Sequence, residues 1–564
     1  MTSLVPLPVI LPLLGTGATL MLFRFPRAQR VVSALVLTAV VVVAAVLLVA
    51  VDRDGTQVVW LGGWEGLGIA LVADRLAVLM LLVSAIVTLA VLLYSIGHGI
   101  TGDEKETPVS IYHPTFLTLV AGVSNAFLAG DLFNLFVSFE MLLFSSYVLL
   151  TLGGTAARVR AGTIYVVVNV VSSMLFLIAL ATTYAAVGTL NLAQVADRLD
   201  GLPPSVALMI QLLLLVTFAI KAAVFPLSLW LPDSYPTAPA PVTAVFAGLL
   251  TKVGVYAIIR TQTLLFPDSP LSTLLMVAAL LTMVIGILGA IAQSDIKRML
   301  SFTLVSHIGY MIFGVGLATE AGVGGAVFYV AHHITIQTAL FLVVGLIERR
   351  AGSTALLRLG GLARLSPLLG VLFFVPAMNL AGIPPMSGFL GKVDLFQAGV
   401  ADGSPLALVL VAGGTATSLL TLYAVAKTWA LAFWRSPEQA HDMARLLIGQ
   451  EERREQDDHP VPAMVEHRGH VHVGSVAFGA ADLDDARQVA DADSPDRDLH
   501  QLLEAGRLPD RLPLLMVLPT AGLVLASLAI TVVAGPLVGY TDRAAADLAD
   551  RDSYVAAVMD GVPR

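Results

Sequence analysis

The chain has 564 residues, of which 57% are hydrophobic and 13% are charged, whereas a soluble protein carries roughly 25% charged residues. Lipid must therefore be the solvent for most of the chain. Because the sequence contains no cysteine, it excludes disulfides, thiolate metal sites, iron–sulfur clusters and covalently attached haem within the chain. The net charge of −8 points to no specific partner, since much of the acidity lies in one polar segment near the C-terminus.

Fourteen apolar stretches are long enough to cross a bilayer, which takes roughly 20 residues for about 30 Å of hydrocarbon. The first, MTSLVPLPVILPLLG, lacks the basic region of a signal peptide and is expected to remain as a membrane helix. The stretches lie near residues 3–23, 31–51, 72–96, 114–130, 132–153, 163–187, 204–230, 242–262, 270–293, 299–318, 322–347, 366–392, 404–434 and 512–536. The sequence therefore predicts an all-α polytopic membrane protein.

Basic residues in the short loops predict the orientation of these spans. An even number of spans places both termini on one side of the membrane. One face collects Arg24, Arg27, Arg30, Lys105, Arg158, Arg160, Lys297, Arg298, Arg349, Arg350, Arg358 and Arg364, and the other holds Arg53, Arg75, Arg198 and Arg260. By the positive-inside rule the richer face is cytoplasmic, so both termini are expected outside.

The polar segment 435–511 then lies in the cytoplasm. It mixes charges of both signs with Gly, Pro and Asp, as in EERREQDDHP and DLDDARQVADADSPDRD. This composition cannot bury enough apolar surface for a core, so we expect a mostly flexible loop with short helices. Its EHRGHVHVG stretch carries His467, His470 and His472, which have the chemistry to bind a divalent metal, but a solvated loop without metal is the preferred interpretation.

Two spans carry a lysine beside a proline break. The seventh contains KAAVFPLSLW, with Lys221 and Pro226, and the twelfth contains AGIPPMSGFLGK, with Pro384, Pro385 and Lys392. The two lie five spans apart. Broken helices at matching positions of two five-helix units are typical of transporters built from inverted repeats, and an odd number of helices per unit gives the units opposite orientations.

Ionisable side chains also occur deep inside apolar spans. Each charged group near the midplane costs roughly 2.5–3.5 kcal/mol even on the lenient insertion scale, and such groups usually mark an ion or proton path. They are Glu140, Lys221, Lys252 and Lys392, together with the imidazoles of His307, His332 and His333. Snorkelling to an interface is the alternative for Lys392 and the preferred interpretation for Lys427. A hydrogen-bonded core residue is the alternative for the histidines, above all for His332.

A chain of lysines suits proton transfer for a physical reason. Loss of solvation lowers the affinity of a buried ammonium for its proton, and a carboxylate within a few ångströms restores that affinity. Movement of Glu140 relative to Lys221 would therefore make the lysine take up or release a proton, and histidines can relay between such sites. The break at Pro226 frees backbone carbonyls and admits water beside the lysine.

Four stretches resemble the antiporter-like membrane subunits shared by respiratory complex I and Mrp cation/proton antiporters. They are DLFNLFVSFEMLLFSSYVLL, KAAVFPLSLWLPDSYPTAPAPVTAVFAGLLTKVGVYAIIR, SDIKRMLSFTLVSHIGYMIFG and LAGIPPMSGFLGKVDLF, within roughly residues 70–430. The resemblance implies fourteen helices with two inverted five-helix repeats, the seventh and twelfth helices being discontinuous. The lysine of GFLGK and the sequence of the predicted fifth helix, NLFVSFEMLLFSSYVLL, resemble the corresponding stretches of the D-type subunits of Mrp antiporters.

The resemblance also implies a division of the chain. Helices 1–3 occupy 1–113, the first repeat 114–262 and the second repeat 270–434. The polar cytoplasmic loop follows at 435–511, and the last helix with an external C-terminal tail occupies 512–564.

Residue roles follow from the same resemblance. Glu140 matches the fifth-helix glutamate, Lys221 the seventh-helix lysine, Lys252 the bridging lysine of the eighth helix and Lys392 the terminal lysine of the twelfth. One position departs from the family, which often has lysine four residues after the eleventh-helix histidine, where this chain has Gln337. Since a neutral amide cannot carry a proton as a lysine does, the central relay must depend on His333, His307, Lys252 and water.

The function implied is that of a subunit of a multisubunit Na⁺/H⁺ antiporter in the bacterial cell membrane. Protons would move inward along Glu140, Lys221, Lys252, His307 or His333, and Lys392 while sodium leaves, with Asp233 in the turn LPDSYPTAPAP as the candidate for proton uptake. The proton gradient supplies the energy, so no cofactor and no enzymatic activity are expected. The expected partners are other Mrp-type subunits, membrane lipid, protons and Na⁺, and not nucleic acid.

Two alternatives stay open. The first is a proton-pumping subunit of complex I or of a membrane-bound hydrogenase, in which a partner's electron transfer drives the same residues. The second is a scaffold subunit that holds the complex together while ions pass elsewhere. The sequence does not distinguish whether the Na⁺ path lies in this chain or in a neighbour.

Overall fold

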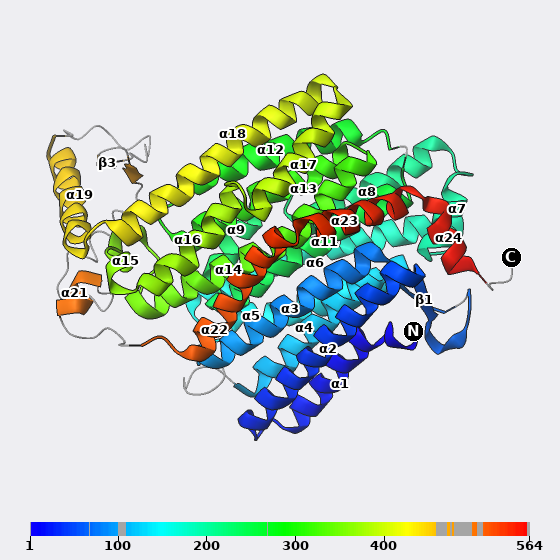
Figure 1. The fold of residues 1–564 in the computed structure, drawn as a ribbon, viewed down its shortest axis with the longest axis horizontal. Helices are drawn as coiled ribbons and strands as arrows, with labels where there is room; N and C mark the ends of the chain where they lie inside the picture. The colour runs from blue at the N-terminus through cyan, green and yellow to red at the C-terminus, as the bar shows by residue number, and fades with distance from the viewer. Residues whose placement is uncertain are drawn as a thin grey trace.

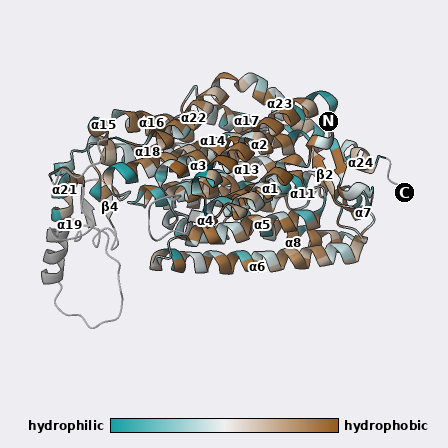
Figure 2. Cartoon of the chain, turned by 90° about the horizontal axis from the view of Figure 1, so that it is seen from below, coloured by the Kyte–Doolittle hydropathy of each residue, from teal (hydrophilic) through white to brown (hydrophobic). Residues whose placement is uncertain are grey.

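The computed structural model describes residues 2–66, 68–99, 109–267, 269–457, 471–473, 476–478, 499–504 and 511–560. Within these ranges the chain is a bundle of long helices that run side by side (Figure 1). Apolar residues cover most of the helices, and polar residues gather near the helix ends (Figure 2). The all-α polytopic fold expected from the sequence is thereby confirmed.

Each of the fourteen predicted spans falls on a helix or on a helix that is interrupted. In chain order they are α1 (Leu7–Met21), α2 (Pro26–Asp54), α3 (Arg75–His98), α4 (Val109–Leu128), α5 (Leu132–Thr151), α6 (Ala156–Val187), α8 (Pro204–Ala222) with α9 (Trp230–Ser234), α10 (Ala240–Val245) with α11 (Thr251–Leu264), α12 (Ser272–Ile291), α13 (Ile296–Gly316), α14 (Glu320–Ala351), α16 (Pro367–Ala381) with α17 (Ser387–Asp402), α18 (Pro405–Thr428) and α22 (Leu514–Val532). In the described part of the chain, eleven helices are long and apolar enough to cross a membrane, and α1 and α16 are shorter apolar helices.

Short elements connect the long helices. The helical ones are η1 (Thr2–Leu4), η2 (Leu61–Gly63), α7 (Leu192–Leu199), η3 (Tyr235–Thr237), η4 (Phe246–Leu250), η5 (Leu356–Arg358), α15 (Leu362–Leu365), η6 (Trp429–Trp434), α19 (Pro437–Asp457), α21 (Leu499–Glu504), α23 (Ala534–Ala549) and α24 (Arg551–Met559). Two antiparallel hairpins pair β1 (Gln57–Trp60) with β2 (Ala70–Ala73) and β3 (Val471–Val473) with β4 (Val476–Phe478).

Both expected discontinuities are present. Helix α8 ends at Ala222, and Ala223 adopts a left-handed conformation with φ of 58°, so the helix stops before Pro226 is reached. The carbonyl of Ile220 beside the break accepts hydrogen bonds of 3.2 Å from the backbone N–H of Ala223 and from the indole of Trp230. In the twelfth span, α16 ends at Ala381, and α17 begins at Ser387, after Pro384 and Pro385. Each break therefore exposes helix-end carbonyls within an apolar bundle.

The centre of the bundle is formed by helices that are buried all round. The apolar windows of Ala240–Leu264 and Glu320–Ala351 are completely buried, whereas those of α2, α18 and α22 bury about a third of their residues. Close packing of α12 on α13 requires glycine, because a Cβ added to Gly286 would clash with the backbone of Ser306. Lys252 lies on one of these central helices, and Lys221 and Lys392 lie on α8 and α17, which pack against them.

Two further helices follow the last predicted span. After a bend at Val533, α22 continues into α23, which packs along α14 and α3, and α24 then packs on α7 (Figure 1). Arg75 at the start of α3 pairs with Asp547 at 2.7 Å and with Asp52 at 3.0 Å. The last predicted span, 512–536, thus ends near the start of α23, which continues to Ala549.

Most of the polar segment 435–511 lies outside the described residues, including His467 and His470, so the expectation for EHRGHVHVG stays a prediction. The described pieces are α19, α21 and the β3–β4 hairpin. Helix α19 packs on η5 and on α21. The beginning and the end of the segment therefore meet beside the bundle.

Candidate functional site

The first group of ionisable residues joins three helices at the seventh-helix break. Lys221 lies in the last turn of α8 and is 4% exposed, and half-buried Glu140 projects from α5. Ser173 of α6 lies between them: its hydroxyl donates to Oε1 of Glu140, and Nζ of Lys221 lies 3.2 Å from the same hydroxyl oxygen. Figure 2 shows α5, α6 and α8 as neighbours at one edge of the molecule. Glu140 and Lys221 are thus brought together as the sequence led us to expect, but through a serine that the sequence patterns did not reveal.

Lys252 lies at the start of α11 and is completely buried. Its Nζ donates a hydrogen bond of 2.6 Å to the carbonyl of Ala247. That carbonyl belongs to η4, a π-helical turn inside the eighth span. A π-turn shifts the backbone hydrogen-bond register and often marks a functional site. Here it offers a carbonyl to the buried ammonium, for which no carboxylate partner occurs among the described residues.

The two central histidines face each other across α13 and α14. The ring centroids of His307 and His333 lie 5.1 Å apart, and Nδ1 of His307 is 2.7 Å from the hydroxyl of Tyr329. Both nitrogens of His333 and Nε2 of His307 are buried without a hydrogen-bond partner in the described part of the protein. Buried polar groups are normally satisfied, so these imidazoles stand out from an ordinary hydrogen-bonded core.

The side chain of His332 forms its hydrogen bond with α17 and not with the pair formed by His307 and His333. Its Nδ1 lies 3.0 Å from the hydroxyl of Ser387, the first residue of α17. Ser387 is itself within hydrogen-bond distance of the side chain of Asn379 near the end of α16. His332 therefore joins α14 to the twelfth-helix break through Nδ1, while its Nε2 is buried without a hydrogen-bond partner in the described part of the chain.

Lys392 lies on α17 and is 3% exposed. Its Nζ donates to the carbonyls of Leu380 and Ala381, at 3.2 and 3.0 Å, and stands 5.0 Å from the ring centroid of Tyr310. A cation at the carboxyl end of a helix is stabilised by the helix dipole. This ammonium ends among helix carbonyls and an aromatic ring, an arrangement that does not fit snorkelling to an interface.

Gln337, at the position where the family often has lysine, bridges two central helices. Its Nε2 donates a hydrogen bond of 2.8 Å to the carbonyl of Leu300 on α13, while its Oε1 has no partner in the described part of the chain. The amide lies one turn after His333 on α14. It therefore contributes a polar amide beside the histidines and no titratable group.

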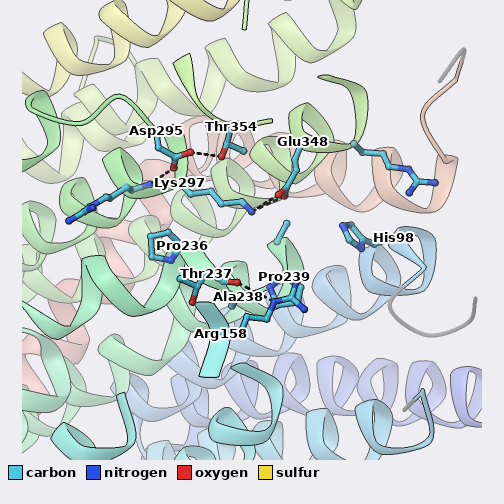
Figure 3. A pocket seen from close by; sticks show the side chains of 13 residues that line it. His98, Arg158, Pro236, Thr237, Ala238, Pro239, Asp295, Lys297, Glu348 and Thr354 are labelled. Carbon is cyan, nitrogen blue, oxygen red and sulfur yellow. Dashed lines mark hydrogen bonds and ion pairs between the residues drawn. The ribbon is translucent and has the colours of Figure 1, made fainter. Parts of the chain in front are cut away.

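Four of the basic residues expected to share a face line one cavity of about 570 Å³, namely Arg158, Lys297, Arg298 and Arg349. The turn Pro236–Ala240 and the side chains of Asp295 and Glu348 complete its wall (Figure 3). Lys297 pairs with Glu348 at 2.8 Å. The structure thus brings basic residues from separate segments of the chain to one end of the bundle.

Asp233 lies next to this cavity. Its carboxylate pairs with Arg298 at 2.9 Å, and both side chains are about half exposed. The sequence singled out Asp233 because no other carboxylate lies on its turn, yet Asp295 at the start of α13 and Glu348 near the end of α14 line the same cavity. The only sequence feature that could have indicated these two carboxylates is an acidic residue next to basic residues at the end of a span, as in SDIKR and IERR.

No group of three or more histidine or acidic side chains able to hold a metal occurs within the described ranges. The arrangement offers instead a series of buried amines and imidazoles, one carboxylate, and polar groups that lack protein partners. Such a series can hold and pass protons when water links its members.

Comparison with known proteins places this geometry in a family. The sequence profile described as "NADH:quinone oxidoreductase/Mrp antiporter, TM" matches residues 129–421, slightly more than half of the chain. A relative from Alkalihalophilus pseudofirmus, named as the D-type subunit of a Na⁺/H⁺ antiporter, is 41% identical over 454 residues, which are 80% of this chain and 90% of that protein.

Two solved structures share the fold. A chain in the structure of the Mrp complex from Dietzia sp. superposes with a TM-score of 0.81 at 31% identity, and the match covers 99% of this chain and 100% of that one. A chain of the archaeal membrane-bound sulfane sulfur reductase, a respiratory membrane complex, gives a TM-score of 0.80 at 24% identity, with the same coverage, and shows the fold alone. The chain therefore belongs to the NADH:quinone oxidoreductase/Mrp antiporter family of membrane subunits.

Proposed function

We propose that the chain is the D-type subunit of a multisubunit Na⁺/H⁺ antiporter and that it provides the proton path of that complex. The name of the Alkalihalophilus relative and the likeness to the Mrp complex of Dietzia support the assignment. The observation that carries the path is the Glu140–Ser173–Lys221 contact, because it connects a carboxylate to a buried amine by hydrogen bonds.

The proposed path continues through Lys252, the pair His307 and His333, and Lys392. Lys252 is buried beside the π-turn, and the histidines carry nitrogens that lack partners among the described protein atoms. Water at these nitrogens would connect the lysines of α11 and α17. The break at Pro384–Pro385 supplies the carbonyls of Leu380 and Ala381 to which Lys392 donates, and the break before Pro226 directly follows Lys221.

We further propose the bacterial cell membrane as the location, with both termini outside. On that orientation the cavity beside Asp233 opens to the cytoplasm, because it collects four of the loop arginines and lysines and cytoplasmic loops are enriched in these residues. Asp233 is the proposed site of proton exchange with bulk water at that side. The half-exposed ion pair with Arg298 leaves its carboxylate accessible.

The test is Na⁺-dependent proton flux in vesicles from antiporter-deficient cells that contain the whole complex. Glu140→Ala and Lys221→Ala are each expected to lose flux on the order of a hundredfold, the usual scale for a positioned proton-transfer group. The matched control is Lys427→Ala, since Lys427 also lies in an apolar span but donates to the carbonyls of Ile291 and Gln293 at a helix end. Unchanged flux in both test variants, with normal assembly, would contradict the assignment.

A redox-driven pump is the second candidate, since the sulfane sulfur reductase chain has the same fold. It predicts proton transport that depends on electron flow in a partner and not on Na⁺. Purification of the native complex separates the two candidates, because a redox pump copurifies with flavin, quinone or iron–sulfur subunits. A scaffold role predicts that charge-neutralising substitutions reduce assembly on a native gel and leave flux per assembled complex unchanged.

A further inference from the structure

We propose that Ser173 is the proton relay between Lys221 and Glu140, an inference that rests on the proposed function. Neither family resemblance nor residue type pointed to this serine. It is 8% exposed on α6, and it contacts both members of the ionisable pair at once.

The two hydrogen bonds at Ser173 are arranged as a proton relay requires. The Lys221 ammonium has only protons to donate, and its nearest side-chain acceptor is Oγ of Ser173, at 3.2 Å. The hydroxyl proton of Ser173 is directed in turn at Oε1 of Glu140. Both hydrogen bonds therefore run in the same direction, from the amine to the carboxylate.

Proton transfer along this order balances in atoms and charge. Nζ of Lys221 gives one proton to Oγ of Ser173 while Oγ gives its own hydroxyl proton to Oε1 of Glu140. An ammonium–carboxylate pair becomes a neutral amine and a neutral carboxylic acid, and the serine hydroxyl is restored. The reverse step returns the proton to Lys221, so the serine is neither consumed nor charged.

The Lys221 ammonium also lies near Asn169 and Phe139. Asn169, one turn earlier on α6, offers its backbone carbonyl to Lys221 at 3.5 Å, and the ring of Phe139 stands 5.6 Å from the ammonium. Neither group can pass a proton to the carboxylate, since one is a carbonyl and the other a hydrocarbon ring. Within the described part of the chain, Ser173 is the side chain that contacts both Lys221 and Glu140 through hydrogen bonds.

The neighbouring residue provides a matched comparison. Ser172 is also buried on α6, but its hydroxyl donates to the backbone carbonyl of Thr217 on α8 at 3.2 Å. It ties the same two helices together without touching either ionisable group. Loss of its hydroxyl therefore reports on α6–α8 packing alone.

The experiment compares Ser173→Thr with Ser173→Val in the whole complex, because threonine and valine have nearly the same shape and differ in the hydroxyl. Na⁺-dependent proton flux per assembled complex is measured in vesicles, in H₂O and in D₂O. Threonine is expected to keep flux close to wild type, and valine to lose on the order of tenfold or more. The ratio of flux in H₂O to that in D₂O is expected to rise for valine, since proton transfer then limits the rate.

Three results would overturn the relay: valine as fast as threonine, both variants equally slow, or Ser172→Ala as slow as the valine variant with an unchanged isotope ratio. If Ser173→Val fails to assemble, Ser173→Ala is judged by the same criteria. Glu140→Ala and Lys221→Ala are measured in parallel. If Glu140→Ala and Lys221→Ala are slow and Ser173→Val is normal, the relay is contradicted and the proposed function is not. If all three variants show normal flux, the proposed function is contradicted as well.

Discussion

The two broken helices carry similar sequence signals, a lysine and a proline break, but hold their lysines in different ways. Lys221 reaches a carboxylate through Ser173, whereas Lys392 binds the carbonyls of Leu380 and Ala381 beside the ring of Tyr310. The first lysine is balanced by a countercharge, and the second by dipoles and a π-system. The two matching breaks therefore hold lysines whose electrostatic partners differ in kind.

The largest effect is expected from Lys221→Arg. Arginine keeps the positive charge opposite Glu140 but does not release its proton in proteins. If Lys221 carries protons, Na⁺-dependent flux in vesicles falls on the order of a hundredfold. Flux near the wild-type value would mean that Lys221 is only a fixed countercharge for the carboxylate.

Lys392→Arg applies the same change to the other break. Its ammonium caps the end of α16, a role that arginine can also fill. We expect flux to fall on the order of tenfold to a hundredfold with normal assembly on a native gel, because a cap is retained and a proton carrier is lost. Full flux would reduce Lys392 to a structural cap and would remove it from the path.

Tyr310→Leu removes the ring next to Lys392 and leaves the Lys221 site untouched. A desolvated cation–π contact is worth about 1–2 kcal/mol, so a several-fold change in flux is expected. Tyr310→Phe is the control, since it keeps the ring and loses only the hydroxyl that donates to the carbonyl of Gly414. Equal flux in the leucine and phenylalanine variants would contradict a role for the ring.

Gln337→Met is expected to have the smallest effect on transport. It removes the hydrogen bond to the carbonyl of Leu300, at a cost of about 0.5–1.5 kcal/mol, since that carbonyl lies within α13 and keeps its helical partner. Thermal unfolding of the solubilised complex should shift downward while flux stays near the wild-type value. A loss of flux comparable with that of Lys392→Arg would place the amide in the path itself.

Sequence patterns predicted the large-scale features well, because these features rest on composition. Long apolar stretches fix the spans, and the proline breaks locate both interruptions, although α8 ends at Ala222 and not at Pro226. The bent continuation of α22 into α23 was not predicted, since Asp542, Arg543 and Asp547 give α23 the composition of a polar tail.

The contacts within the site depended on tertiary packing and could not be read from the chain. A serine in a membrane helix is common, so nothing marked Ser173 before α5, α6 and α8 were seen to meet at it. The π-turn that offers the Ala247 carbonyl to Lys252 likewise has no distinctive sequence pattern. Residue types thus identified the ionisable groups, and the structure supplied the partners that connect them.

The central claim is that the proton passes through Glu140 and Lys221 as one unit. The most direct test measures Na⁺-dependent proton flux for Glu140→Gln, Lys221→Met and the double variant, each normalised to assembled complex. Residues that act as a unit give strongly non-additive losses, so we predict that the double variant is no slower than the slower single one. A double variant whose loss equals the product of the two single losses would contradict the claim.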